Sequence, residues 1–125
     1  RYIIDFLLVF IGGGVGSALR LLLNKIIPND TFPYSTLTVN LVGSFLIGFI
    51  ISYLIHHNLL KSDYYYLLVV GICGGLTTFS TFSLDNVNLL KSNDLIYSLV
   101  YIIISVSFCI LLAYIGYTLM NKILN

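Results

Sequence analysis

Four long apolar segments are the feature that most constrains how this 125-residue chain can fold. They cover residues 3–27, 33–55, 64–90 and 95–120, and each is near the ~20 residues that a helix needs to cross a bilayer. Short polar connections containing proline, asparagine, histidine or charged residues separate them. The sequence therefore predicts an all-α, multi-pass protein of the cell membrane, with one four-helix transmembrane domain over residues 1–125.

Composition excludes several other classes of protein. With 58% hydrophobic and only 9% charged residues, the chain has the lipid bilayer as its expected partner. A net charge of +1 without blocks of like charge gives no reason to expect nucleic acid. Cys73 and Cys109 lie inside apolar segments, where we expect free buried thiols rather than a disulfide or a metal site. The glycine run at 12–16 has no following lysine, and no histidine lies within a segment to activate a serine. We therefore expect no enzymatic activity and no catalytic residue.

The third segment contains the run GGLTTFSTFS, Gly74–Ser83, near its middle. As one continuous helix, residues 64–90 would extend ~40 Å, against ~30 Å of hydrocarbon. We predict a break near Gly74–Thr78, with unwinding or kinking at Gly74 and Gly75 that relieves the excess length. Backbone at membrane depth leaves the helix only where protein buries it or where it lines a wet cavity. The interruption therefore indicates a permeation site.

Neutral hydrogen-bonding side chains recur at helical spacing around this run. Three share a face of the second segment and three share a face of the fourth: Thr36, Asn40 and Ser44, then Tyr101, Ser105 and Cys109. Hydroxyl residues of the third segment add to them: Thr77, Thr78, Ser80, Thr81 and Ser83. Such groups donate hydrogen bonds to an anion without holding it as tightly as lysine, as conduction requires. Hydroxyls also bond to their own backbone, an alternative that stays open for Ser105, whereas an unpaired Asn40 amide at mid-span is costly.

Phe79 and Phe82 lie three residues apart, directly after the predicted break. A phenyl ring has a positive edge that can face a small anion, and packing in the protein interior is the alternative. Arg20 either attracts anions in a vestibule or extends from the helix end to the headgroups. Small residues recur at helix-packing spacing in three pairs: Gly12 and Gly16, Gly71 and Gly75, and Ser44 and Gly48.

The cations are evenly divided between the two ends of the predicted bundle. Four spans place both termini and the middle loop on one side, with three cations: Arg1, Lys61 and Lys122. The other side carries three more: Arg20, Lys25 and Lys91. Because neither side has an excess of cations, the positive-inside rule favours neither orientation of the chain in the membrane. Such a balance is expected of a protein inserted in both orientations.

A small dual-topology, proton-coupled multidrug exporter is the alternative function, since it shares the size and the four spans. Proton-coupled carriers usually need a carboxylate or histidine within the membrane. This chain has no glutamate, its aspartates lie near segment ends, and His56 and His57 lie in a loop. It also has no tryptophan to hold a cationic aromatic drug. A purely structural subunit is a third possibility.

Three motifs together resemble one known family: GGLTTFSTFS, Thr38-Val39-Asn40 followed by Gly43-Ser44-Phe45, and Gly12-x-x-x-Gly16 with Arg20 four residues on. The chain is similar, over essentially its whole length, to the Fluc/CrcB fluoride channels. The resemblance implies an antiparallel, dual-topology homodimer that exports fluoride passively and reduces cytoplasmic fluoride toxicity. A heterodimer with a paralogue stays open.

The resemblance also implies that Phe79 and Phe82 line the fluoride path with Asn40 as a donor beside it, and Tyr101 and Ser105 match the family's polar track on the fourth segment. Together with the candidates argued above from the residues themselves, the expected fluoride path comprises Arg20, Asn40, Phe79, Ser80, Thr81, Phe82, Ser83, Tyr101 and Ser105. A structural sodium ion at the dimer centre is expected on the backbone carbonyls of Gly74 and Thr77. Cys109 stands where a further hydroxyl is expected.

Overall fold

The computed structural model describes all of residues 1–125 and contains helices but no strands. In chain order they are α1 (Tyr2–Ile26), α2 (Tyr34–His56), the π-helix η1 (Tyr65–Cys73), α3 (Gly74–Leu76), α4 (Phe79–Lys91) and α5 (Leu95–Leu124). The third span consists of η1, α3 and α4 in succession. Four spans are long and apolar enough to cross a membrane, which confirms the predicted all-α, four-span architecture.

The third span is interrupted at Thr77 and Thr78, just beyond the glycines. Thr77 has φ −83° and ψ 155°, and Thr78 has φ −150° and ψ 123°, so both are extended. The break lies within the predicted range, but Gly74 itself is helical, with φ −64° and ψ −37°. An extended residue advances up to ~3.3–3.6 Å against 1.5 Å in a helix, so the break adds length. The expectation that it relieves excess length is therefore wrong.

Glycines bring α1 close to η1 and α3. A Cβ atom added at Gly12 would collide with the carbonyl oxygen of Leu67, and one at Gly75 would collide with that of Gly13. Gly71 is equally tight, since its added Cβ would lie 2.8 Å from the Gly12 Cα. The two GxxxG pairs therefore serve backbone-to-backbone helix packing, which is the usual role of small residues in lipid.

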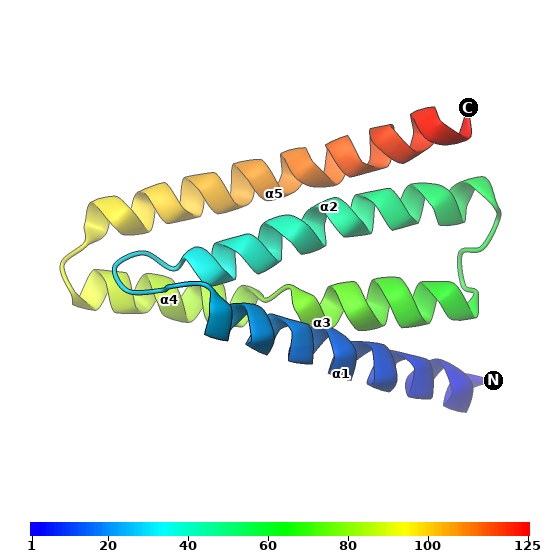
Figure 1. Cartoon of the computed structure of the whole chain (residues 1–125), viewed down its shortest axis with the longest axis horizontal. Coiled ribbons are helices and arrows are strands. Elements are labelled where there is room, and N and C mark those ends of the chain that lie inside the picture. Colours follow the sequence, from blue (N-terminus) through cyan, green and yellow to red (C-terminus); the bar gives the residue numbers. More distant parts are fainter.

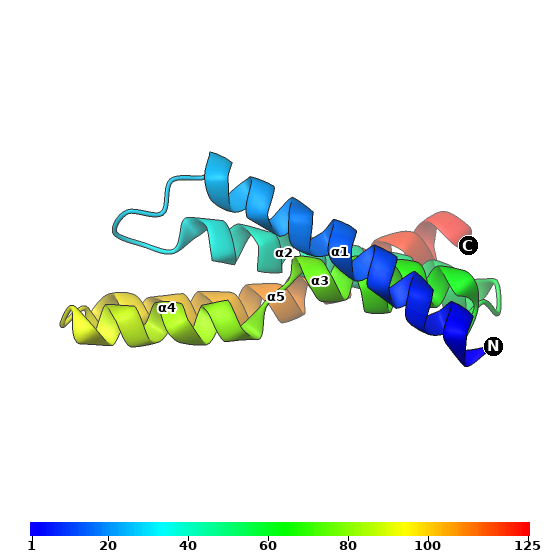
Figure 2. The ribbon, with the colours of Figure 1, turned by 90° about the horizontal axis from the view of Figure 1, so that it is seen from below.

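The helices form two closely packed sets. α1 packs chiefly on η1 and α3, while α2 runs along α5 (Figure 1). The second contact is also close, because an added Cβ at Gly48 would collide with the Ala113 carbonyl oxygen. Both termini and the α2–η1 loop lie at one end of the bundle (Figure 1). At the other end, the α1–α2 connection and the α4–α5 connection diverge (Figure 2).

Most of the surface of the single chain is apolar. Only 21 of 125 residues are buried, while large hydrophobic side chains such as Phe10 and Ile96 are 79% and 70% exposed. Such faces are stable only against lipid or against another protein surface.

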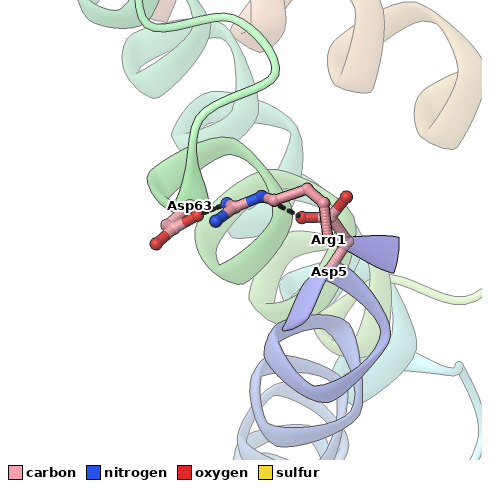
Figure 3. A network of polar contacts seen from close by, with 3 residues as sticks. All are labelled: Arg1, Asp5 and Asp63. Carbon is pink, nitrogen blue, oxygen red and sulfur yellow. Dashed lines mark ion pairs between the residues drawn. The ribbon is translucent and has the colours of Figure 1, made fainter. Parts of the chain in front are cut away.

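At the start of α1, Arg1 forms ion pairs with two aspartates (Figure 3). Arg1 pairs with Asp5, at 3.4 Å between Nε and Oδ1, and with Asp63 in the segment leading into η1. Exposed ion pairs of this kind contribute about 0–1 kcal/mol. The network therefore positions the first turn of α1 more than it stabilises the bundle.

Candidate functional site

A cleft of about 630 Å³ lies beside the break in the third span. Residues from α2, η1, α3, the break, α4 and α5 line it. Its amide and hydroxyl side chains are Asn40, Ser44, Thr77, Thr78 and Ser105. The other lining residues are apolar, glycine or cysteine: Gly43, Ile47, Val69, Val70, Cys73, Gly74, Phe79, Phe82, Val106, Cys109 and Ile110. The wall thus offers neutral hydrogen-bonding groups and no charged side chain.

Asn40 holds the backbone of the break. Its Oδ1 accepts a hydrogen bond from the Thr78 N–H at 2.8 Å, and its Nδ2 donates to the Thr78 carbonyl at 3.1 Å. One amide side chain therefore replaces both helical partners that the extended residue lacks. This matters at membrane depth, where each unpaired peptide group costs several kcal/mol. The second N–H of Nδ2 makes no hydrogen bond within the chain and stays available to a ligand.

Arg20 contacts the break from α1. Its Nε donates to the carbonyl oxygen of Gly75 at 3.0 Å, and the side chain is partly buried. The guanidinium thus reaches the C-terminal end of α3, where unpaired carbonyls carry partial negative charge. The side chain extends toward the middle of the third span, so it does not reach out to the headgroups.

Thr78 caps α4. Its Oγ1 accepts a hydrogen bond from the Thr81 N–H at 3.1 Å and lies 3.2 Å from the Ser80 Oγ. The N-terminus of α4 consequently lies inside the span, with its partial positive charge, while carbonyl groups end α3 just before it. The break therefore presents both donors and acceptors.

The carbonyl groups at the break fit a hard cation. Gly74 and Thr77 both line the cleft, and the Thr77 carbonyl accepts no hydrogen bond within the chain. The Thr77 hydroxyl is used otherwise, since it donates to the Cys73 carbonyl at 2.9 Å. No group of three or more His, Cys, Asp or Glu side chains that would suit a transition metal occurs. Backbone oxygens are the ligands that hard cations take and that hold sodium at unwound membrane helices.

The two phenylalanines differ in environment. Phe82 is 8% exposed, whereas Phe79 is 77% exposed in the single chain, although their ring centroids lie 5.4 Å apart. Both line the cleft. Phe82 also packs on the fully buried ring of Tyr101, at 4.9 Å between centroids. Of the two roles considered for these rings, facing an anion or packing in the protein interior, Phe82 has the interior packing and also lines the cleft.

Tyr101 lies beside the cleft wall rather than in it. Its hydroxyl donates to Asp85 Oδ2 at 2.9 Å. A second buried pair joins the same two helices, because the Ser98 Oγ donates to Asn86 Oδ1 at 2.8 Å. Sequence reasoning missed Asp85, Asn86 and Ser98. Ser98 carried a signal, since it continues the stripe of Tyr101 and Ser105 at positions i, i+3 and i+7.

The remaining predicted hydroxyls separate into two groups. Ser105 is 6% exposed, lines the cleft, and its Oγ has no hydrogen-bond partner within the chain, so its hydroxyl does not bond to its own backbone. Ser83 does form such a bond, with its Oγ donating to the Phe79 carbonyl at 2.9 Å. Ser80, Thr81 and Ser83 lie outside the cleft wall. The structure therefore brings Asn40, Thr77 and Ser105 together around one cleft.

Known proteins share this sequence along most of its length. The family model described as CrcB-like protein, Camphor Resistance (CrcB), matches residues 7–117. A protein of Flavobacterium psychrophilum named "Fluoride-specific ion channel FluC" is 42% identical over 102 residues, which are 78% of this chain and 82% of that protein. Proteins with that name from Gloeothece citriformis and Aquifex aeolicus are 41% and 40% identical, over 95% and 89% of this chain and 98% and 92% of theirs. This multi-pass membrane protein thus belongs to the CrcB-like family.

Proposed function

We propose that this chain forms a fluoride-selective channel, which lets fluoride leave the cell passively and so reduces its toxicity in the cytoplasm. The observation that carries the proposal is the cleft beside the break, whose wall combines amide and hydroxyl donors with phenyl rings and no charged side chain. Relatives about 40% identical over most of their length carry the name of a fluoride-specific ion channel. Ion channels catalyse no reaction, so the names of these relatives support the expectation that the chain is not an enzyme.

The chemistry of the wall suits fluoride. A small, strongly hydrated anion gives up its water only where donors replace it at close range, and Asn40 and Ser105 supply such donors. The Asn40 amide has an unused N–H, and the Ser105 hydroxyl has no partner in the chain. Because no lysine or arginine lines the cleft, binding is weak enough for the ion to leave again. The edges of Phe79 and Phe82 complete the passage, since ring edges carry partial positive charge.

An antiparallel homodimer is part of the proposal. Phe79, Val106 and Ile110 line the cleft and are exposed in the single chain, so a second copy placed against them would close its open side. The two ends of the bundle carry equal numbers of lysines: Lys61 and Lys122 at one, Lys25 and Lys91 at the other. Arg20 and Arg1 are engaged within the chain. Neither orientation in the membrane is therefore favoured by charge.

The proposed homodimer also contains a structural sodium ion at its centre. The carbonyls of Gly74 and Thr77 from two copies would hold the ion and neutralise the partial negative charge at the two α3 ends. Replacing sodium with a large organic cation is expected to loosen the dimer and slow fluoride flux. Dimer mass and flux that ignore this exchange would remove sodium from the proposal and leave the channel assignment standing.

The channel is tested in liposomes that contain the purified protein and potassium fluoride or potassium chloride. Valinomycin is added to balance charge, and an ion-selective electrode follows anion release. Rapid fluoride release with negligible chloride release is expected. Equal release of both anions would contradict selectivity. Release of neither, followed by fluoride release after a paralogous subunit is added, would replace the homodimer with a heterodimer.

A proton-coupled multidrug exporter is disfavoured by the same wall, because no aspartate, glutamate or histidine lines the cleft to carry a proton. Uptake of a cationic aromatic dye driven by a proton gradient in these liposomes would reverse that preference.

A further inference from the structure

We propose that the Cys109 thiol is a modification site on the anion path, at which thiol-exchange reagents block the channel reversibly. The inference rests on the proposed function and adds a site to it. Cys109 is a free cysteine, is partly exposed, and lines the same cleft as Asn40 and Ser105. In the proposed dimer the cleft becomes the ion passage, so a small neutral reagent that enters along this passage meets the sulfur.

Ser105 gives the independent reason to place a ligand next to Cys109. Its hydroxyl is buried and has no hydrogen-bond partner in the chain, although buried polar groups in native proteins are nearly always paired. Ser105 and Cys109 are four residues apart on α5 and therefore neighbours on one face. A ligand that satisfies the Ser105 hydroxyl in the cleft therefore lies on the same helix face as the thiol.

The second cysteine, Cys73, shows whether lining the cleft is enough for a thiol to react or whether exposure is also needed. Cys73 also lines the cleft, from η1, but it is only 2% exposed. Reaction with a thiol-exchange reagent needs an ionised and accessible sulfur. Cys109 is thus the sulfur expected to react, and Cys73, which lines the same cleft from another helix, is the matched control.

The reaction is an exchange with methyl methanethiosulfonate, a small neutral reagent. The thiol proton leaves to water, and the thiolate sulfur of Cys109 attacks the methylthio sulfur. A disulfide to the methylthio group forms, the sulfur–sulfonyl bond breaks, and methanesulfinate leaves with that electron pair. The product adds a methylthio group to the cleft, and a dithiol reductant removes it by a second exchange.

The test uses the full-length protein in liposomes, with fluoride release measured before and after the reagent. Each rate is divided by the rate of the same untreated variant. We expect the treated wild-type rate to fall about tenfold, because the added methylthio group narrows the passage and places an apolar group next to the Ser105 hydroxyl; about 1.4 kcal/mol of added barrier corresponds to this factor. Dithiothreitol should restore the rate. The variant Cys109→Ser should keep its own untreated rate in the presence of reagent, whereas Cys73→Ala should be blocked like the wild type.

Two results would overturn the inference. One is unchanged flux in wild-type protein whose modification at Cys109 mass spectrometry has verified. The other is a block that survives in Cys109→Ser, with Cys109→Ala as a second variant in case the serine protein does not fold. Absence of fluoride release from untreated wild-type liposomes would count against the proposed function itself, so the two failures are distinguishable.

Discussion

Asn40 offers the sharpest test of how the break and the passage depend on each other. Replacing it with alanine removes both hydrogen bonds to Thr78 and leaves the N–H and the carbonyl of that residue without partners. Each unpaired buried group costs about 1–3 kcal/mol, so we expect the free energy of unfolding to fall by about 2–6 kcal/mol. Asn40→Ala should therefore show a lower melting temperature in detergent and reduced fluoride release.

Asn40→Asp separates the two roles. The carboxylate still accepts from the Thr78 N–H, but it cannot donate to the Thr78 carbonyl, and it places a negative charge in a cleft that has none. Two unit charges 4 Å apart repel by about 4 kcal/mol at an effective dielectric constant of 20, which corresponds to roughly a thousandfold slower fluoride passage. Protonation of the introduced carboxyl removes this charge, so flux through Asn40→Asp should recover as the pH falls.

The assay is fluoride release from liposomes, with the melting temperature measured on the same preparations. Thr38→Ala is the matched control, because Thr38 lies two residues away on α2 and bonds only to the Tyr34 carbonyl on the exposed side. That variant should resemble the wild type in both measurements. Wild-type stability and flux in Asn40→Ala would refute the role given to the Thr78 bonds. Flux through Asn40→Asp as fast as wild type at neutral pH would refute the electrostatic argument.

Three further substitutions test the fold around the cleft. Gly12→Ala forces a methyl group against the backbone of η1 and should destabilise the bundle by about 1–3 kcal/mol. Gly14→Ala is the control, because its methyl group meets nothing within 4 Å and should leave stability unchanged. Thermal unfolding compares the two variants. Thr78→Ala removes the cap of α4 and should lower stability by about 1 kcal/mol, with Thr78→Ser restoring it, as denaturant titration would reveal. Tyr101→Phe leaves the Asp85 carboxylate without its donor and should lower stability by about 1.5–3 kcal/mol; an unchanged melting temperature would contradict this pairing.

Hydropathy was sufficient to predict the four spans, because a run of about twenty apolar residues has few alternatives to a membrane helix. The break was predicted to within its range, but its residues were misassigned. A glycine serves either an unusual backbone conformation or close packing, and a single sequence does not distinguish these uses. Here Gly75 packs against the Gly13 backbone, while the β-branched Thr77 and Thr78 take the extended conformation.

Contacts between distant segments were beyond prediction. Asn40 was expected to need a partner, but Thr78 is 38 positions away, and only the packed fold brings the two together. Two alternatives were left open for Arg20, a vestibule that attracts anions or the headgroups, and nothing in the sequence indicated its hydrogen bond to the Gly75 carbonyl, 55 positions away. Ser83 and Ser105 look alike in the sequence, yet one bonds to its own helix and the other has no partner.

The two extended residues interrupt the third span, and hydrogen bonds from two neighbouring helices hold this point from both sides. Rotation at Thr77 and Thr78 would have to break both Asn40 bonds and the Arg20 bond to Gly75 together. Alternating-access transport needs one half of a protein to rock against the other, on a microsecond-to-millisecond timescale. Because these bonds hold the break, we expect a static passage, and relaxation dispersion at the Thr78 amide should be flat. Throughput is then limited by the dwell time of each ion and not by motion of the protein.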